Sequence, residues 1–463
     1  MGILDVPGIT KAVADATYAP VQVTNERLSL LDPRIDADPT GTTTVDAALQ
    51  AAFDMLATAD GGTLFVPPGQ YKLSRKPDGE AGQGYSAAIM RGVVEGVGAA
   101  SHFYLDPATT AVQNPTRYYP IRIGKNLEGT TGPIVFRNVK LTGNNALIGG
   151  SSVMGFAARH DESSSSTVHS DDVTIEGCHI HDTAVAVGCT KQANANVVAY
   201  FNRGWRVLGN HIATTSNKAI ELGHCDGGWA LDNDIVDAFD GPQTIFYSVN
   251  TWFQRNRVRY RNTGINIAQG SQRFSVVDND VECMSTAANG AAAQAFFLRT
   301  EPNAGTSPVI QSGVIRGNRF VNNQAHTIMR AVQFQTRTEV TAATFQNLLF
   351  VDNLIDGIFY FRDPTSPAKT TIQDVTLRGN RFTKAMDTVD QATCMVRRVR
   401  FDSNQFTLAQ AINASDWQFR DDAFTGGLTL GASSSRIRGT VDAPSATVTD
   451  SGTTNAVTAR ALL

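Results

Sequence analysis

Short runs of alternating apolar and polar residues repeat along most of the chain, and many of these runs end at an asparagine. Four of the asparagines, Asn210, Asn233, Asn256 and Asn279, follow one another at intervals of 23 residues. In each repeat an apolar residue lies three positions before the asparagine and another lies two positions after it. Alternation with a period of two is typical of β-strands, so the pattern predicts short strands in every repeat.

The same frame extends in both directions along the chain. Four further asparagines follow at gaps of 39, 35, 27 and 24 residues: Asn318, Asn353, Asn380 and Asn404. Upstream, Cys178 takes the position of the asparagine between apolar residues of the same spacing. The longer gaps predict repeats that carry insertions.

A strand-rich repeat of about 20–25 residues indicates a solenoid. Leucine is too sparse for the leucine-rich class, and short strands with small turn residues favour a parallel β-helix. Strands of successive coils would pair at about 4.8 Å, and one asparagine in each coil would bond to those above and below it in a ladder. We therefore predict that residues from about 130 to 410 form one solenoid, with these asparagines in a structural role.

A different pattern precedes the repeats. Thr43 or Thr44 is placed to cap a helix over about residues 44–59, whose apolar residues fall on one face, and Gly61-Gly62 is placed to end it. Residues 63–73 (TLFVPPGQYKL) then predict a strand, a tight turn and a second strand.

This segment resembles the entry module of the pectate-lyase-like superfamily, in which a turn, a helix ending in Gly-Gly, a strand, Pro-x-Gly and Tyr follow in that order. The usual pair of acidic residues before the helix is replaced here by Thr43-Thr44. The resemblance implies an all-β, right-handed parallel β-helix whose N-terminal helix covers the open end of the core and blocks end-to-end strand pairing. It does not fix the chemistry, because one fold hosts many activities.

We divide the chain into three parts. Residues 1–30 are predicted to be a leader or attachment segment, residues 31–424 the parallel β-helix, and residues 425–463 a C-terminal β-rich segment for trimerisation or capping. The last part is polar and rich in small residues, and no coil frame is visible in it.

Composition excludes several classes of function. The net charge of −4 gives no electrostatic basis for binding nucleic acid, and no apolar run is long enough to span a membrane. Five cysteines, an odd number without a CxxC pair, predict buried thiols. The N-terminus lacks the features of a secretion signal, so a protein acting outside a cell would leave by another route.

Carboxylates on an outward face are the candidate chemistry. Glu221 lies between Ile220 and Leu222, which we expect to point inward, so Glu221 points outward. Asp237 and Asp240 fall at the turn that enters the equivalent strand of the next coil. Glycoside hydrolysis uses two carboxyls about 5–9.5 Å apart, a spacing that one or two coil steps supply. These three residues are our predicted catalytic cluster. The alternative interpretation is that the aspartates form turns and Glu221 is a solvated surface residue.

Four residues are predicted to bind substrate beside this cluster: Trp229, Trp252, His224 and Asn266. The two tryptophans share one outward position in successive coils, which suits either a sugar platform or a subunit contact. Glu282 and Glu301, which flank insertions, form a second candidate patch. His179 and His211 are also equivalent outward positions, but no third ligand is evident, so no metal or cofactor is predicted.

Within the superfamily the chain looks most like phage tailspike and polysaccharide depolymerase proteins. That resemblance implies a homotrimer on the virion, attached through its N-terminus to a phage tail or baseplate protein, that binds and degrades a bacterial surface polysaccharide (capsule, O-antigen or exopolysaccharide) as an endo-acting glycosidase. Two alternatives stay open: a non-catalytic carbohydrate-binding fibre, and a lyase or epimerase of the same fold.

Overall fold

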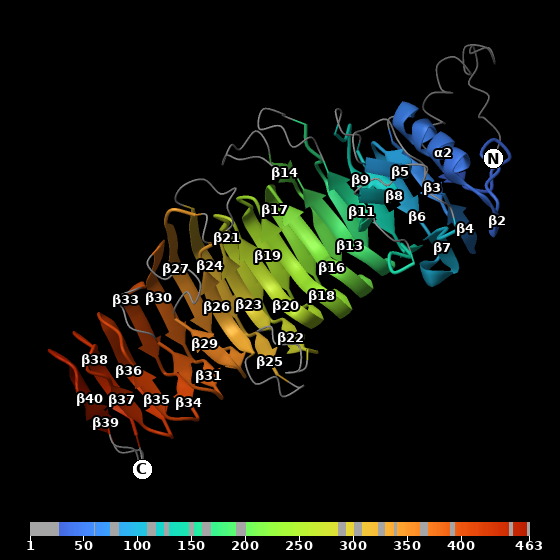
Figure 1. Ribbon diagram of the computed structural model, residues 1–463. Helices are drawn as coiled ribbons and strands as arrows, with labels where there is room; N and C mark the ends of the chain where they lie inside the picture. Colours follow the sequence, from blue (N-terminus) through green and yellow to red (C-terminus); the bar gives the residue numbers. More distant parts are fainter. Residues whose placement is uncertain are drawn as a thin grey trace, which may run out of the picture.

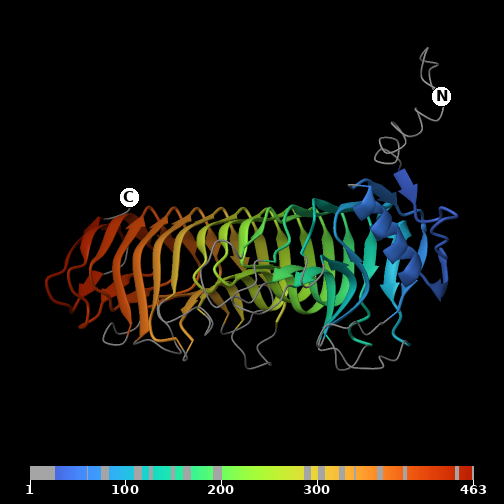
Figure 2. The ribbon, with the colours of Figure 1, turned by 90° about the horizontal axis from the view of Figure 1, so that it is seen from above.

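The chain forms an elongated stack of parallel β-coils, with the N-terminal helix at one end and the last coils at the other (Figures 1 and 2). The predicted parallel β-helix is confirmed. The predicted leader lies outside the described residues except for its last four. The computed structural model describes residues 27–59, 61–74, 83–108, 117–124, 129–147, 152–159, 168–190, 201–285, 293–300, 308–322, 329–337, 340–361, 369–388, 394–443 and 448–460.

The strands stack in three columns, which we call A, B and C, and every strand pairing among the described residues is parallel. Column A precedes the ladder asparagines. It contains β1 (Arg27–Ser29), β3 (Thr63–Phe65), β6 (Gly92–Glu95), β9 (Ile134–Arg137), β12 (Val173–Glu176), β15 (Arg206–Leu208), β17 (Cys225–Leu231), β19 (Val249–Gln254), β21 (Gln272–Val277), β24 (Val309–Arg316), β27 (Ala343–Val351), β30 (Thr370–Arg378), β33 (Met395–Asp402), β36 (Trp417–Phe424), β38 (Arg438–Asp442) and β40 (Ala456–Arg460), with β14 (Asn202–Arg203) paired to β17.

Column B follows the ladder asparagines, and four long strands begin in it and bend into column C. Column B contains β2 (Thr40–Thr44), β4 (Gly69–Leu73), β7 (Ser101–Leu105), β10 (Lys140–Thr142), the first parts of β13 (His179–Thr190), β16 (His211–Gly223), β18 (Asp234–Ile245) and β20 (Arg257–Ala268), then β22 (Asp280–Cys283), β25 (Arg319–Val321), β28 (Leu354–Ile355), β31 (Arg381–Phe382) and β34 (Gln405–Phe406).

Column C carries the surface on which the candidate site lies. It contains β5 (Gln83–Ile89), β8 (Arg117–Ile123), β11 (Ser152–Arg159), the second parts of the four long strands, β23 (Gln294–Arg299), β26 (Arg330–Gln335), β29 (Ile358–Tyr360) and β32 (Met386–Asp387), and continues in a separate sheet of β35 (Gln410–Ile412), β37 (Leu428–Leu430) and β39 (Val448–Asp450).

Inward side chains of all three columns form one continuous apolar core along the stack. Toward the C-terminal end, equivalent residues of successive coils are phenylalanines that stack on one another. The ring centroids of Phe382 and Phe406 are 4.7 Å apart, and those of Phe406 and Phe424 are 4.5 Å apart. Each coil thus buries its apolar face against its neighbours, as a solenoid requires.

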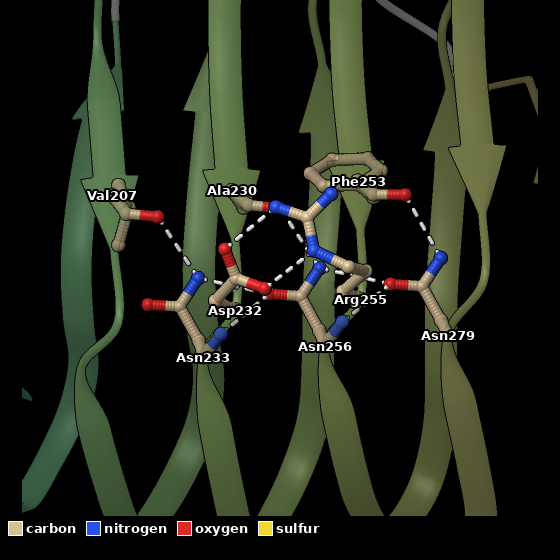
Figure 3. A network of polar contacts seen from close by, with 8 residues as sticks. All are labelled: Val207, Ala230, Asp232, Asn233, Phe253, Arg255, Asn256 and Asn279. Carbon is tan, nitrogen blue, oxygen red and sulfur yellow. Dashed lines mark hydrogen bonds and ion pairs between the residues drawn. The ribbon is translucent and has the colours of Figure 1, made fainter.

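The predicted asparagine ladder is confirmed. The side-chain oxygen of Asn256 accepts from the backbone N–H of Asn233 at 3.1 Å and from its side-chain amide at 2.9 Å. The same amide of Asn233 donates to the Val207 carbonyl at 2.9 Å (Figure 3). These contacts repeat from Asn210 to Asn404, and all eight asparagines are at most 1% exposed.

The ladder ends in a different residue on each side. Cys178 occupies the asparagine position, as predicted, and its backbone N–H donates to Asn210 Oδ1 at 2.9 Å. Burial raises the pKa of its thiol to about 12, so the group stays neutral. All five cysteines are buried and free, as predicted. At the far end, Asp422 accepts from the backbone and side-chain amides of Asn404 at 2.8 and 2.7 Å, and burial raises its pKa to about 7.

Asp422 therefore makes the stability of the chain depend on pH. The pKa in the folded chain, about 7, lies above the ordinary value of 3.8, so the stability from this group is complete below pH about 4 and is lost as pH rises through 7. Asp422→Asn cannot ionise and keeps an oxygen for Asn404. We expect its Tm to exceed that of the wild type at about pH 8.5 and the gain to shrink toward pH 4.5.

Thermal melting at the two pH values measures this difference. Asp421→Asn is the control, because this exposed neighbour pairs with Arg460 at the surface and should give no gain that grows with pH. Equal gains for Asp422→Asn at both pH values would contradict the assignment.

The end of the core beside β1 and β2 is covered by α2 (Asp46–Thr58), which matches the predicted helix over about residues 44–59. Leu49, Phe53 and Leu56 are buried on its inner face. The expected threonine cap is wrong: Val45 is the N-cap residue and makes no side-chain bond. Thr43 instead donates its backbone N–H to Asp38 at 2.7 Å.

The C-terminal segment differs from the expectation in one respect. The strands β37 to β40 are parallel additions to the preceding coils, so the coil frame continues to Arg460 rather than ending at residue 424. A role of residues 425–463 in trimerisation or capping stays a prediction. In the part of the chain that the structure describes, no helix has the length and apolar character needed to cross a bilayer.

Candidate functional site

A groove of about 590 Å³ lies on the outward surface of column C, over the bent strands β16, β18 and β20 and the following β23 and β26. Glycines at the bend bring successive coils close together: a Cβ on Gly241 would lie 2.0 Å from the Gly264 carbonyl oxygen. The groove is lined by Asn217, Lys218, Asp240, Gln243, Ile245, Phe246, Asn262, Thr263, Asn266, Ala268, Gln269, Gln294, Phe297, Arg299, Arg330, Gln333 and Gln335.

Two outward rows of side chains run along this groove, one residue from each coil. The register of the strands aligns the first row as Glu221, Gln243, Asn266, Phe297 and Gln333. Glu221 and Asn266 thus share a row two coils apart, as the sequence predicted.

The second row lies three residues earlier in each strand and consists of Lys218, Asp240, Thr263, Gln294 and Arg330. The two rows together present amide, hydroxyl, carboxylate and cationic groups beside one aromatic ring. Such a mixture suits a hydroxyl-rich ligand.

Asp240 is the carboxylate that lines the groove. Its Oδ1 accepts from the Asn262 side-chain amide at 2.8 Å and from the Thr263 backbone N–H at 3.1 Å. Burial raises the pKa of this carboxyl, while the charge of Lys218 opposes the rise. A carboxylic acid that keeps its proton to higher pH is the group that acid catalysis at a glycosidic oxygen requires.

Glu221 lies one coil away and is nearly buried, with 5% of its surface exposed. Its carboxylate forms an ion pair with Lys218 and accepts from the Gln243 side-chain amide at 3.4 Å. Lys218 also interacts electrostatically with Asp240. The Lys218 ammonium group, which is paired with Glu221, would have to shift for a ligand to reach that carboxylate.

Two polar atoms of groove-lining residues have unused hydrogen-bonding capacity. Asn266 Oδ1 and Arg330 Nε are buried and have no hydrogen-bond partner among the described residues. Leaving such atoms unpaired costs free energy, roughly 1–3 kcal/mol each. A ligand that displaces the side chains covering these atoms, donates to Asn266 and accepts from Arg330 would recover this cost.

Asp237 does not belong to the predicted catalytic cluster, which is a correction. It adopts a left-handed conformation (φ 54°) before the bend of β18. Its carboxylate is 53% exposed and forms an ion pair with Arg261 at 3.1 Å. The local turn therefore leaves it outside the set of residues that line the groove.

The predicted substrate-binding residues separate onto three places, and only Asn266 lines the groove. His224 is fully buried at the corner after β16, against the rings of Phe201 and Tyr247, so it cannot contact a ligand there. Trp229 and Trp252 occupy equivalent positions, as predicted, and their rings stack at 5.2 Å. They belong to column A, however, and thus to a different face.

The second candidate patch stays a prediction, because only one of its two residues lies in the described part of the chain. Glu282 lies in column B, 13% exposed, with Arg259 Nε 2.5 Å from its carboxylate. Glu301 lies outside the described residues. His179 and His211 are neighbours at 5.9 Å, as their spacing predicted. In the described ranges no three His, Cys, Asp or Glu side chains gather in a way that would hold a metal ion.

Sequence reasoning missed several groove residues, among them Lys218, Gln243, Thr263, Phe297 and Arg330. Lys218 and Gln243 are outward positions of the same two strands that were used to place Glu221 and Asp240. The position of Phe297 depends on the register across the long insertion after β22, which periodicity does not fix.

No protein-family model and no curated protein matches the chain. Among solved structures, it is similar to a double mutant of the tailspike protein of E. coli bacteriophage HK620, with a TM-score of 0.57 and 14% identity over 97% of this chain and 82% of the tailspike chain. A mutant of that tailspike in complex with a hexasaccharide gives a TM-score of 0.54 and 13% identity over 96% and 81% of the two chains. The chain therefore shares the right-handed parallel β-helix fold of this tailspike.

Proposed function

We propose that the chain binds a polysaccharide in the groove of column C and hydrolyses it. The observation that carries the proposal is the pair of polar rows that line one groove, with Asp240, a carboxyl whose pKa is raised by burial, in the second row. Further support comes from the similar HK620 tailspike, which has been solved with a hexasaccharide.

In this proposal Asp240 donates a proton to the glycosidic oxygen as the bond breaks. Glu221 supplies the second carboxylate, either as a nucleophile or as a base toward water. Lys218 pairs with Glu221, and its movement toward a bound substrate would free Glu221 while leaving one positive charge in the groove. Gln243 and Asn266, in the same row, would hold the hydroxyls of neighbouring sugar units.

A second function, binding without cleavage, is favoured by one observation. Glu221 is nearly buried and tied to Lys218, so only Asp240 among the predicted carboxylates lines the groove. A lyase or an epimerase of the same fold is the third possibility, in which Lys218 would be the base.

We propose further that the polysaccharide belongs to a bacterial surface and that the protein is a homotrimer on a phage virion, attached through its N-terminal segment to a tail or baseplate protein. The low fraction of charged residues, 18%, suits a surface covered by neighbouring subunits. Light scattering should give three times the 49.6 kDa mass of the chain. A value near the mass of one chain would exclude the trimer.

Incubation with a panel of capsular polysaccharides, lipopolysaccharides and exopolysaccharides tests the function. New reducing ends without ultraviolet absorbance would indicate hydrolysis, whereas new ends that absorb as unsaturated sugars would indicate a lyase. Binding of a polysaccharide without release of reducing ends would support a non-catalytic, carbohydrate-binding fibre. Absence of both binding and cleavage across a panel that includes the true host polysaccharide would reject the proposal.

A further inference from the structure

A second cavity lies on the outward surface of column A, near the C-terminal end of the stack. In five successive coils the chain there has a residue with positive φ at the equivalent position: Asn347 (54°), Asp374 (55°), Arg398 (55°), Asp416 (59°) and Arg436 (55°). Repeating the same bend hollows the surface into a cavity of about 680 Å³. Its lining residues are Asn347, Asp374, Thr376, Arg397, Arg398, Val399, Arg400, Asp416, Gln418, Arg436 and Arg438.

The lining is strongly basic. Five arginines stand against two aspartates, which leaves a net charge of +3 in a chain whose overall charge is −4. Both aspartates already hold an arginine through two hydrogen bonds. Asp374 binds Arg398 with both distances at 2.6 Å, and Asp416 binds Arg436 at 2.6 and 2.8 Å.

Two arginines remain for a ligand. Arg400 and Arg438 have no hydrogen-bonded or ion-paired partner among the described residues, and both are exposed. Strand register places them in one outward row on either side of Gln418. Two coil steps separate them, about 10 Å. Their guanidinium groups therefore match two acid groups of one extended ligand, each held through paired N–H donors.

The rest of this row indicates which ligand carries those acid groups. Going toward the N-terminus, Thr376 is the next residue. Leu349, Val314 and Ser275 follow, and the stacked indoles of Trp252 and Trp229 lie five and six coil steps from Arg400. Arg206 lies over Trp229 with its guanidinium carbon 5.2 Å from the ring centre. Aromatic surface, hydroxyl and guanidinium groups along one line are the chemistry that holds sugar rings and their acid substituents.

We propose that this row of column A is a second saccharide site, selective for acidic chains whose carboxylate or phosphate groups bind Arg400 and Arg438. It lies on a different face from the groove that contains Asp240. The site would hold the polymer without cleaving it, so that binding and chemistry occur on separate surfaces of the stack.

The test is a binding titration of the full chain with three probes: an oligogalacturonate, a phosphorylated oligomannose and neutral dextran. Arg400→Gln/Arg438→Gln is expected to weaken binding of the acidic probe by at least about tenfold, the loss of charge-assisted contacts from two guanidiniums. Arg381→Gln, an exposed arginine of column B, is the matched control and should bind as the wild type does. Salt should weaken the wild-type affinity.

The probes separate the sources of the acid group. Preference for the oligogalacturonate assigns carboxylates, and preference for the phosphorylated probe assigns phosphates. Turnover of Arg400→Gln/Arg438→Gln under saturating substrate should match that of the wild type, which distinguishes failure of this site from failure of the groove. Unchanged affinity in the double variant with an unchanged Tm, or equal binding of dextran, would overturn the proposal.

Discussion

Replacement of Asp240 by asparagine is expected to lower the rate of polysaccharide hydrolysis by at least about 100-fold, the usual contribution of a positioned general acid. Asparagine keeps the shape of the side chain and can still contact Asn262 and Thr263, but it has no proton to donate. Binding of the intact polysaccharide should therefore survive, and Tm should change little. Reducing-end release under saturating substrate measures the effect, with affinity determined separately.

Asp237→Asn is the matched control for this experiment. It makes the same chemical change three residues earlier in the same strand, on a carboxylate that is exposed and paired with Arg261, and it should retain wild-type turnover. Glu221→Gln should also lose at least about 100-fold if Glu221 is the second carboxylate. A wild-type rate of hydrolysis in Asp240→Asn would falsify the assignment of Asp240 as the general acid. A wild-type rate in Glu221→Gln, together with a reduced rate in Asp240→Asn, would exclude Glu221 as the second carboxylate.

The second large effect is expected in the ladder. Asn256→Ala should lower the free energy of unfolding by at least about 3 kcal/mol, because the four hydrogen bonds of its buried side chain are lost at once, three of them to groups named below. The backbone and side-chain amides of Asn233 lose their acceptor, and the Ala230 carbonyl loses the donor that lies 2.8 Å away. Figure 3 shows these three bonds. The cavity left by the amide adds to the cost.

Chemical denaturation followed by circular dichroism measures this loss. Asn217→Ala is the control, since Asn217 is exposed and outside the ladder, and it should change the free energy of unfolding by no more than about 0.5 kcal/mol. A change of similar size in both variants would mean that neighbouring coils reorganise and that the ladder bonds contribute little.

The fold was predictable because one coil repeats and its length is constant over the central region. The interval of 23 residues between Asn210 and Asn279 placed the ladder correctly, since equal spacing puts equivalent residues at the same point of each turn. The C-terminal coils were missed because Asp422 takes over the ladder position after Asn404. A pattern defined by asparagine ends there although the backbone continues.

The candidate site was predictable only in part, and the limit lies at the corners between columns. Alternation along one strand correctly gave the outward direction of Glu221 and its row with Asn266. Alternation stops predicting side-chain direction where a residue with positive φ turns the chain. His224 (φ 49°) is such a residue, and for this reason its burial was not predicted. The spacing also showed correctly that Trp229 and Trp252 are equivalent positions. It could not show that they lie on a different face from Asp240, because the repeat length does not determine the angle between columns A and C.

The three coils between Asn210 and Asn279 have equal lengths of 23 residues, so the length of the stack can change in whole coils. Each coil begins and ends on the same hydrogen-bonding edge, so a duplicated or deleted coil would leave both junctions compatible and change the length by one step of about 4.8 Å. The rows over the groove would lengthen or shorten by one side chain each. Insertion or deletion of one such coil would therefore change the length of the groove in whole steps and leave the residues around Asp240 in place.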